Sequence, residues 1–130
     1  MRKSLAASLA IIILLVVVIS GCSTEVKAYT ESAQMVNVGA NQEFTIALGS
    51  NPTTGYSWQE EHDKANLEFV KKDYRADDKT GKQLVGSGGT EFFVFKALKA
   101  GQTRITFTYR RPWETPSPQD QQQVFTINIK

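Results

Sequence analysis

The segment QTRITFTYR, residues 102–110, decides the class of fold. Its large side chains Ile105, Phe107 and Tyr109 alternate with Thr106 and Thr108. Successive side chains of a β-strand point to opposite faces, so this period of two predicts a strand with one buried face. β-Branched and aromatic residues, which strands favour, occupy both faces of the segment.

Similar patterns extend outward from this segment, and none of them has a convincing helical period. The expected strands are residues 34–38, 43–48, 56–60, 67–74, 91–97, 102–110 and 123–130. Short strands separated by turn residues predict an all-β fold, a two-sheet antiparallel sandwich. All seven phenylalanines lie in these strands, and burial of each contributes about 1.5–3 kcal/mol. We therefore expect the core to be formed by Phe44, Phe69, Phe92, Phe93, Phe95, Phe107 and Phe125.

The N-terminus has the order of a secretory signal: two basic residues, an apolar run over 5–19, and small residues before Cys22. The run is shorter than the roughly 20 residues that a spanning helix needs, so we expect cleavage rather than a retained anchor. Cys22 is the only cysteine, which excludes an intramolecular disulfide. Its place directly after Gly21 resembles a bacterial lipobox, which implies cleavage after Gly21 and lipidation of Cys22. The alternative is a free thiol in a secreted protein.

We therefore expect a lipoprotein signal peptide over 1–21, a lipidated N-terminus and tether over 22–32, and one domain over 33–130. The mature chain would lie outside the cytoplasm, at the cell envelope, and several acyl chains on its N-terminus would hold it to a membrane. Removing Arg2 and Lys3 changes 15 basic and 13 acidic residues to 13 of each. This near-neutral balance offers no electrostatic case for binding nucleic acid, and we expect a monomer.

The few reactive side chains predict a protein that is not an enzyme. His62 is the only histidine, and it is expected in a solvated turn. A hydrolase site with a nucleophile and a base would have to be built around it. A zinc site would lack nitrogen and sulfur ligands, and Asp77 and Asp78 are interpreted as solvated acids rather than calcium ligands. We expect no metal and no cofactor.

Strand parity gathers the unusual loops at one end of the expected sandwich. Each strand crosses the sandwich, so successive connections fall at alternate ends. The connections over 39–42, 61–66 and 98–101 share one end and are plain polar turns. Those over 49–55, 75–90 and 111–122 share the other end, and they hold the longest loops and the glycine-rich run. Rigid sandwiches often carry binding surfaces on such loop clusters.

The first of these loops contains the turn sequence NPTTG. Asn51 can accept a hydrogen bond from the turn backbone, Pro52 fixes φ, and Gly55 permits a tight exit. The result is a stiff tip that presents Thr53 and Thr54. Taken alone, the motif is also explained by a well-made turn without a partner.

The other two loops also allow two interpretations each. The run GSGG, residues 86–89, either lets another backbone approach closely or acts as a flexible linker. It is not a phosphate-binding loop, because no Gly-Lys-Ser/Thr motif follows and the chain enters a strand. In the third loop, Pro112 ends strand pairing and restricts Arg111 to extended geometry. Trp113 is either a binding anchor or a side chain folded back over the sandwich.

Together, NPTTGYSW (51–58), GSGG (86–89) and RPW (111–113) resemble the chagasin family of cysteine-peptidase inhibitors. The resemblance implies an immunoglobulin-like antiparallel β-sandwich of about seven strands that inhibits papain-like cysteine peptidases reversibly by occluding their cleft. It implies that Thr53 lies beside the catalytic cysteine, with the other two loops on either side of the cleft. The implied peptidase-binding residues are Asn51, Pro52, Thr53, Thr54, Gly55, Tyr56, Gly86, Ser87, Gly88, Gly89, Arg111, Pro112 and Trp113.

A cell-surface adhesion or recognition module on the same sandwich is the alternative function. A fold does not determine function, and such a module would also use the lipid anchor and the loop cluster. It does not explain the three motifs together.

Overall fold

The computed structural model describes residues 27–32, 34–77 and 88–130, which form eight strands and one short 3-10 helix. No helix in these ranges is long and apolar enough to span a bilayer. The expected signal peptide and Cys22 lie outside the described residues. The elements are β1 (Ala28–Tyr29), β2 (Met35–Val38), β3 (Glu43–Ser50), η1 (Pro52–Thr54), β4 (Ser57–His62), β5 (Leu67–Ala76), β6 (Gly89–Ala97), β7 (Gly101–Arg110) and β8 (Gln121–Ile129).

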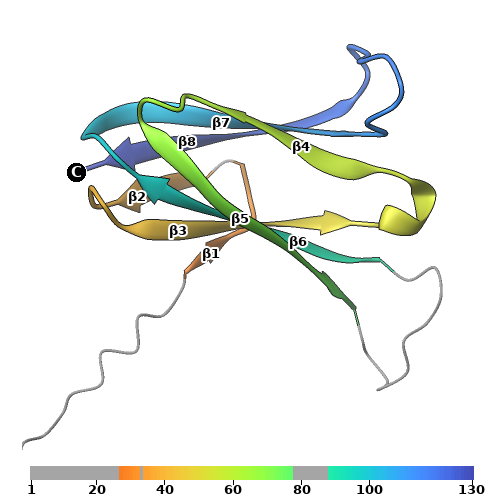
Figure 1. Cartoon of the computed structure of the whole chain (residues 1–130), viewed down its shortest axis with the longest axis horizontal. Coiled ribbons are helices and arrows are strands. Elements are labelled where there is room, and N and C mark those ends of the chain that lie inside the picture. Colours follow the sequence, from red (N-terminus) through yellow and green to blue (C-terminus); the bar gives the residue numbers. More distant parts are fainter. Residues whose placement is uncertain (1–26, 33, 78–87) are drawn as a thin grey trace, which may run out of the picture.

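The strands form two four-stranded sheets that lie face to face (Figure 1). One sheet has the order β1-β3-β6-β5 and the other the order β2-β8-β7-β4. The expected all-β sandwich is confirmed, and the seven expected strands correspond to β2–β8. Two pairings are parallel, β1 with β3 and β2 with β8, and the rest are antiparallel. The sequence does not predict β1, because two residues are too few to show a period.

The core lies between the sheets and is built largely from aromatic side chains. Phe93 of β6 and Phe125 of β8 both meet Phe107 of β7 edge-on, with ring centroids 4.8 and 5.7 Å away, and all three are buried. Phe44 and Phe95 are also buried and stack on each other. Edge-to-face and offset-stacked aromatic pairs each add about 0.5–1.5 kcal/mol to stability beyond the burial of their area.

Two of the seven phenylalanines expected in the core are outside it. Phe69 is exposed on β5, an edge strand whose register shifts between Phe69 and Lys71. Phe92 is half-buried on the outer face of its sheet, because the inward positions of β6 alternate through its neighbour Phe93. Val124 is exposed because the inward positions of β8 begin at its neighbour Phe125.

The predicted separation of loops between the two ends is confirmed. Figure 1 shows η1, the end of β5, the start of β6 and the β7–β8 loop at one end. The β2–β3, β4–β5 and β6–β7 turns lie at the opposite end. His62 lies there too, but it is not a solvated turn residue as expected. It ends β4, its side chain is 6% exposed and paired with Glu60, and its ring meets that of Phe95 edge-on at 5.3 Å.

Candidate functional site

The β3–β4 connection, residues 51–56, is named the tip. Its backbone reverses within the single turn of η1, which begins at Pro52, and Gly55 ends the turn at φ +82°. The Gly55 N–H donates to the Pro52 carbonyl at 2.9 Å, and the Thr54 N–H donates to the Asn51 carbonyl at 3.2 Å. Proline suits the first position of a helical turn, and glycine suits the left-handed residue that closes it. The sequence order Pro-Thr-Thr-Gly therefore dictates the turn.

The two threonine hydroxyls of the tip donate hydrogen bonds within the tip. Thr53 Oγ1 donates to Asn51 Oδ1 and Thr54 Oγ1 donates to the Asn51 carbonyl, both at 2.6 Å. The Asn51 side chain was expected to accept from the turn backbone, but it makes no hydrogen bond that caps η1. Although Thr53 and Thr54 are exposed, these bonds stiffen the tip before any partner arrives.

Aromatic rings join the tip to the sandwich. Tyr56 and Trp58 both pack on Tyr109 of β7, and their ring centroids lie 5.3 and 4.9 Å, respectively, from the centroid of the Tyr109 ring. Trp58 is only 3% exposed. Tyr109 Oη also accepts a 2.9 Å hydrogen bond from the Asn51 N–H, and Trp58 Nε1 donates to the Gly49 carbonyl at 2.8 Å. Both ends of the tip are therefore fixed by buried or half-buried rings.

The β7–β8 loop, which begins at Arg111, is bound to the tip. Arg111 Nε donates to the Thr54 carbonyl at 3.0 Å, and its guanidinium lies 4.7 Å from the centre of the Tyr56 ring. A second guanidinium nitrogen pairs with Glu114 at 3.0 Å. Trp113 is 72% exposed, yet an ideal Cβ on Gly55 would lie only 2.5 Å from its ring. Trp113 therefore touches the tip and still presents most of its surface, and its role as a binding anchor stays a prediction.

The second predicted loop is described only in part. Gly86 and Ser87 lie outside the described residues, whereas Gly88 directly precedes β6 and Gly89 begins it, beside the end of β5. A Cβ on Gly89 would lie 2.3 Å from the Arg75 carbonyl oxygen, so no other residue fits there without displacing backbone. The backbone that approaches Gly89 closely is that of β5 in this same chain, and the approach of a partner's backbone stays a prediction.

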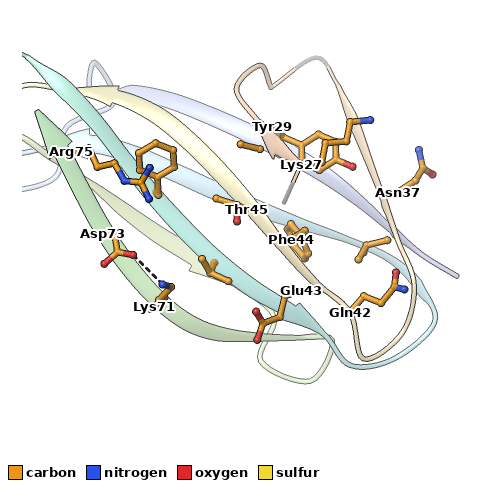
Figure 2. Close-up of a pocket in the computed structure, with 14 residues that line it drawn as sticks. Lys27, Tyr29, Asn37, Gln42, Glu43, Phe44, Thr45, Lys71, Asp73 and Arg75 are labelled. Atoms are coloured by element: carbon orange, nitrogen blue, oxygen red, sulfur yellow. Dashed lines mark ion pairs between the residues drawn. The ribbon is translucent and has the colours of Figure 1, made fainter. Parts of the chain in front are cut away.

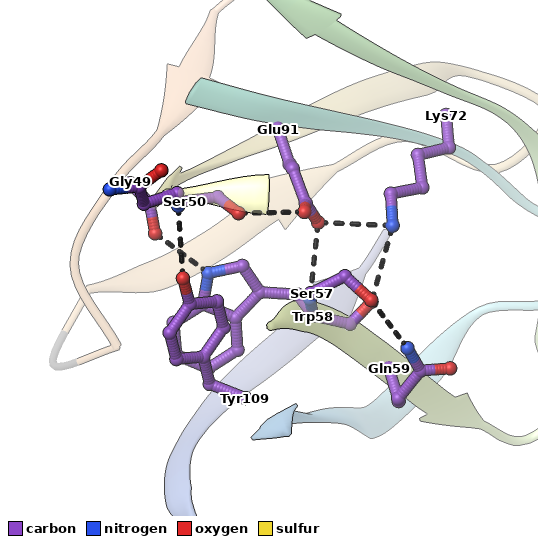
Figure 3. Close-up of polar contacts among 9 residues, drawn as sticks. Gly49, Ser50, Ser57, Trp58, Gln59, Lys72, Glu91 and Tyr109 are labelled. Carbon is purple, nitrogen blue, oxygen red and sulfur yellow. Dashed lines mark hydrogen bonds and ion pairs between the residues drawn. The ribbon is translucent and has the colours of Figure 1, made fainter. Parts of the chain in front are cut away.

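A buried carboxylate below the tip is the feature that the sequence analysis missed. Glu91 of β6 is 2% exposed and takes hydrogen bonds from three other strands (Figure 3). Ser50 Oγ donates to Oε1 at 2.8 Å, while the Trp58 N–H and Lys72 Nζ approach Oε2 at 3.2 and 3.0 Å. The alternation of β6 contains the signal, because Glu91 occupies an inward position two residues before Phe93.

Polar side chains also gather away from the three loops. The described residues contain no group of three or more histidine, cysteine or acidic side chains that could hold a metal. A groove of about 890 Å³ lies on the outer face of the β1-β3-β6-β5 sheet (Figure 2). Phe92 and Val94 line it together with a 3.2 Å ion pair between Lys71 and Asp73. Among the residues that the structure describes, none of the peptidase-binding residues implied by the motifs lines this groove.

Comparison with known proteins agrees with the motifs. Residues 37–129 match the family described as Chagasin family peptidase inhibitor I42. The chain is similar to chagasin of Trypanosoma cruzi, with 35% identity over 80% of this chain and 93% of that protein. It is also similar to amoebiasin-1 of Entamoeba histolytica, with 33% identity over 71% of this chain and 84% of that protein. The crystal structure of the cysteine protease inhibitor EhICP2 from Entamoeba histolytica superposes with a TM-score of 0.66 and 26% identity, covering 79% of this chain and 94% of that one.

Proposed function

We propose, from the premise that this chain belongs to the chagasin family of peptidase inhibitors, that it inhibits papain-like cysteine peptidases reversibly and competitively. The observation that carries the proposal is the joined surface at one end of the sandwich. There, Arg111 and Trp113 hold the tip in a fixed turn while Thr53 and Trp113 stay exposed.

The tip acts as a plug for the peptidase cleft. Thr53 lies beside the catalytic cysteine in this proposal, and the turn at Pro52–Thr54 keeps the chain from lying extended through the cleft as a substrate would. Hydrolysis needs a scissile carbonyl in near-attack geometry. The Thr54 carbonyl is held by Arg111 within the inhibitor, which opposes that geometry. Inhibition is then occlusion of the active site and needs no chemistry from this chain.

Affinity in this proposal comes from a surface that is ordered before binding. Binding normally loses about 0.5–1.5 kcal/mol for each flexible side chain that it immobilises. Here the hydroxyls of Thr53 and Thr54 and the guanidinium of Arg111 already have partners within the protein. Little further ordering is needed, so more of the contact energy contributes to affinity.

Trp113 is the proposed anchor of the complex. Tryptophan is enriched among interface residues whose truncation costs 2 kcal/mol or more, because it buries a large rigid surface. Trp113 is 72% exposed, and its contact with Gly55 limits where the ring can move. We assign the run 86–89 to the opposite side of the cleft, where its glycines would allow close backbone contact with the cleft wall.

The decisive experiment is a titration of papain and of a cathepsin-L-like peptidase with residues 23–130, produced without lipid. This fragment contains every described strand and the whole core. We expect tight inhibition that is competitive with substrate and fully reversed by dilution. No inhibition of either enzyme at micromolar concentration would refute the proposal and favour an adhesion or recognition module.

We also propose that the chain is a lipoprotein of the cell envelope, monomeric and anchored through Cys22. The support is the order of a basic start, an apolar run and small residues directly before the only cysteine. Labelling cells with radioactive palmitate should mark the wild-type chain and leave Cys22→Ser unlabelled. The wild-type chain should sediment with membranes and the variant should not. Label on both, or on neither, contradicts lipidation at Cys22.

A further inference from the structure

We propose that Glu91 is a positioning residue for inhibition: its buried carboxylate fastens both ends of the tip and so sets how the tip enters a peptidase cleft. The inference rests on the proposed function and adds a residue outside the three motifs. Figure 3 shows the arrangement on which it depends, with Ser50, Trp58 and Lys72 around the carboxylate.

The two ends of the tip meet at this one side chain. Ser50 immediately precedes the tip, and its hydroxyl donates to Oε1 at 2.8 Å. Trp58 follows the tip by one residue, and its N–H donates to Oε2 at 3.2 Å. Glu91 belongs to the β1-β3-β6-β5 sheet, whereas Trp58 is in β4, an edge strand of the other sheet. The carboxylate therefore fixes the separation of the tip ends and ties β4 to the opposite sheet.

Lys72 closes the outer side of the arrangement. Its Nζ lies 3.0 Å from Glu91 Oε2 and 3.4 Å from the Trp58 carbonyl oxygen. The Lys72 side chain is 36% exposed and that of Glu91 is 3% exposed, so the ammonium group stands between the carboxylate and water. A single lysine thus neutralises the buried charge and also braces Trp58 directly.

Packing alone does not account for a glutamate at this position. A buried ion pair is often no more stabilising than apolar side chains of similar volume, because desolvation offsets the attraction. The next inward residues of β6, Phe93 and Phe95, are apolar and fully buried. What the carboxylate adds is direction, since each oxygen accepts from a defined donor at one end of the tip. That property serves geometry more than stability.

The test compares Glu91→Leu with Glu91→Gln and with Ile129→Ala, measuring the inhibition constant for papain and the free energy of unfolding. Leucine removes every hydrogen bond to the tip ends. Glutamine can still accept from the Trp58 N–H and donate to Ser50. Ile129 is buried at the opposite end of the sandwich, so its truncation lowers stability without touching the tip. We expect the inhibition constant to rise about tenfold or more for Leu, and to change less than about threefold for Gln and for Ile129→Ala.

A second readout separates positioning from general stability. The amides of Thr54 and Gly55 donate within the turn, so their hydrogen exchange reports the order of the tip in the free protein. Exchange at both amides should accelerate in Glu91→Leu and stay near the wild-type rate in Ile129→Ala. Unchanged exchange in Glu91→Leu overturns the inference, as does an equal loss of inhibition in Ile129→Ala.

Two results would call for a further comparison: a Glu91→Leu variant that does not fold, and a wild-type chain that does not inhibit papain. If Glu91→Leu does not fold, Ser50→Ala removes one tip bond and is expected to raise the inhibition constant about three- to tenfold. A wild-type value for that variant contradicts the role of Glu91. If the wild-type chain does not inhibit papain at all, the proposed function fails. The exchange rates of Thr54 and Gly55 then decide by themselves whether Glu91 orders the tip.

Discussion

Replacing Gly55 by alanine should damage both the turn and the contact with Trp113. Gly55 has φ +82°, and the left-handed region costs an alanine roughly 1–2 kcal/mol. The lower entropy of the unfolded alanine chain offsets about 0.4–1 kcal/mol of this. The new Cβ would also lie 2.5 Å from the Trp113 ring, which must move away. Because Trp113 is 72% exposed, its ring can shift outward into solvent, so we place the cost of this overlap near the low end of the usual overpacking cost, about 1 kcal/mol. The expected total is about 1.5–2 kcal/mol.

Urea denaturation of Gly55→Ala in the wild-type and Trp113→Ala backgrounds separates the two terms. Without the indole, only the backbone term of about 0.5–1 kcal/mol should remain, giving a coupling of about 1 kcal/mol. Gly49→Ala is the matched control, because nothing lies within 4 Å of its added Cβ and its φ is not positive. Equal losses in both backgrounds, or a Gly55→Ala protein as stable as Gly49→Ala, would refute this reasoning.

Three further substitutions test the anchor, the link between loops and the core. Trp113→Ala should raise the inhibition constant for papain about 30-fold while the free energy of unfolding changes by less than about 0.5 kcal/mol, and an unchanged constant would remove its anchor role. Arg111→Lys keeps the charge but loses the planar group that donates to the Thr54 carbonyl and stacks on Tyr56. Inhibition of papain should therefore weaken about three- to tenfold, and retention of full affinity would show that the charge alone suffices. Phe107→Ala, in the centre of the aromatic core, should cost about 3–5 kcal/mol in urea denaturation, and a cost below about 1 kcal/mol would contradict the packing described.

The sequence predicts the sheet architecture well because one face of most strands is buried. Alternation over 102–110 is read directly from the residue types, and parity then assigns the loops to ends. The pattern is less informative where a strand lies at an edge or carries large residues on both faces. Phe69 is exposed on edge strand β5, and Phe92 next to Phe93 leaves open which of the two faces inward.

The site is predictable as a set of motifs but not as a set of contacts. Proline and glycine in the tip determine the turn locally, so its shape follows from the sequence. The bond from Arg111 to Thr54 joins residues 57 positions apart, and no local pattern contains it. The sequence does not predict Glu91 as a site residue, because its hydrogen-bond partners lie on three other strands. Its inward register depends on Phe93 rather than Phe92 facing the core, which the sequence leaves open, and the donors that satisfy its carboxylate follow only from the fold.

Protection of the papain active-site thiol from alkylation tests the central claim most directly. If the tip fills the cleft beside the catalytic cysteine, saturating amounts of residues 23–130 should slow the reaction of iodoacetamide with that thiol by about 100-fold or more. Dilution of the complex should restore the original rate. An alkylation rate unchanged at saturation would contradict occlusion by the tip, even if the protein bound papain elsewhere.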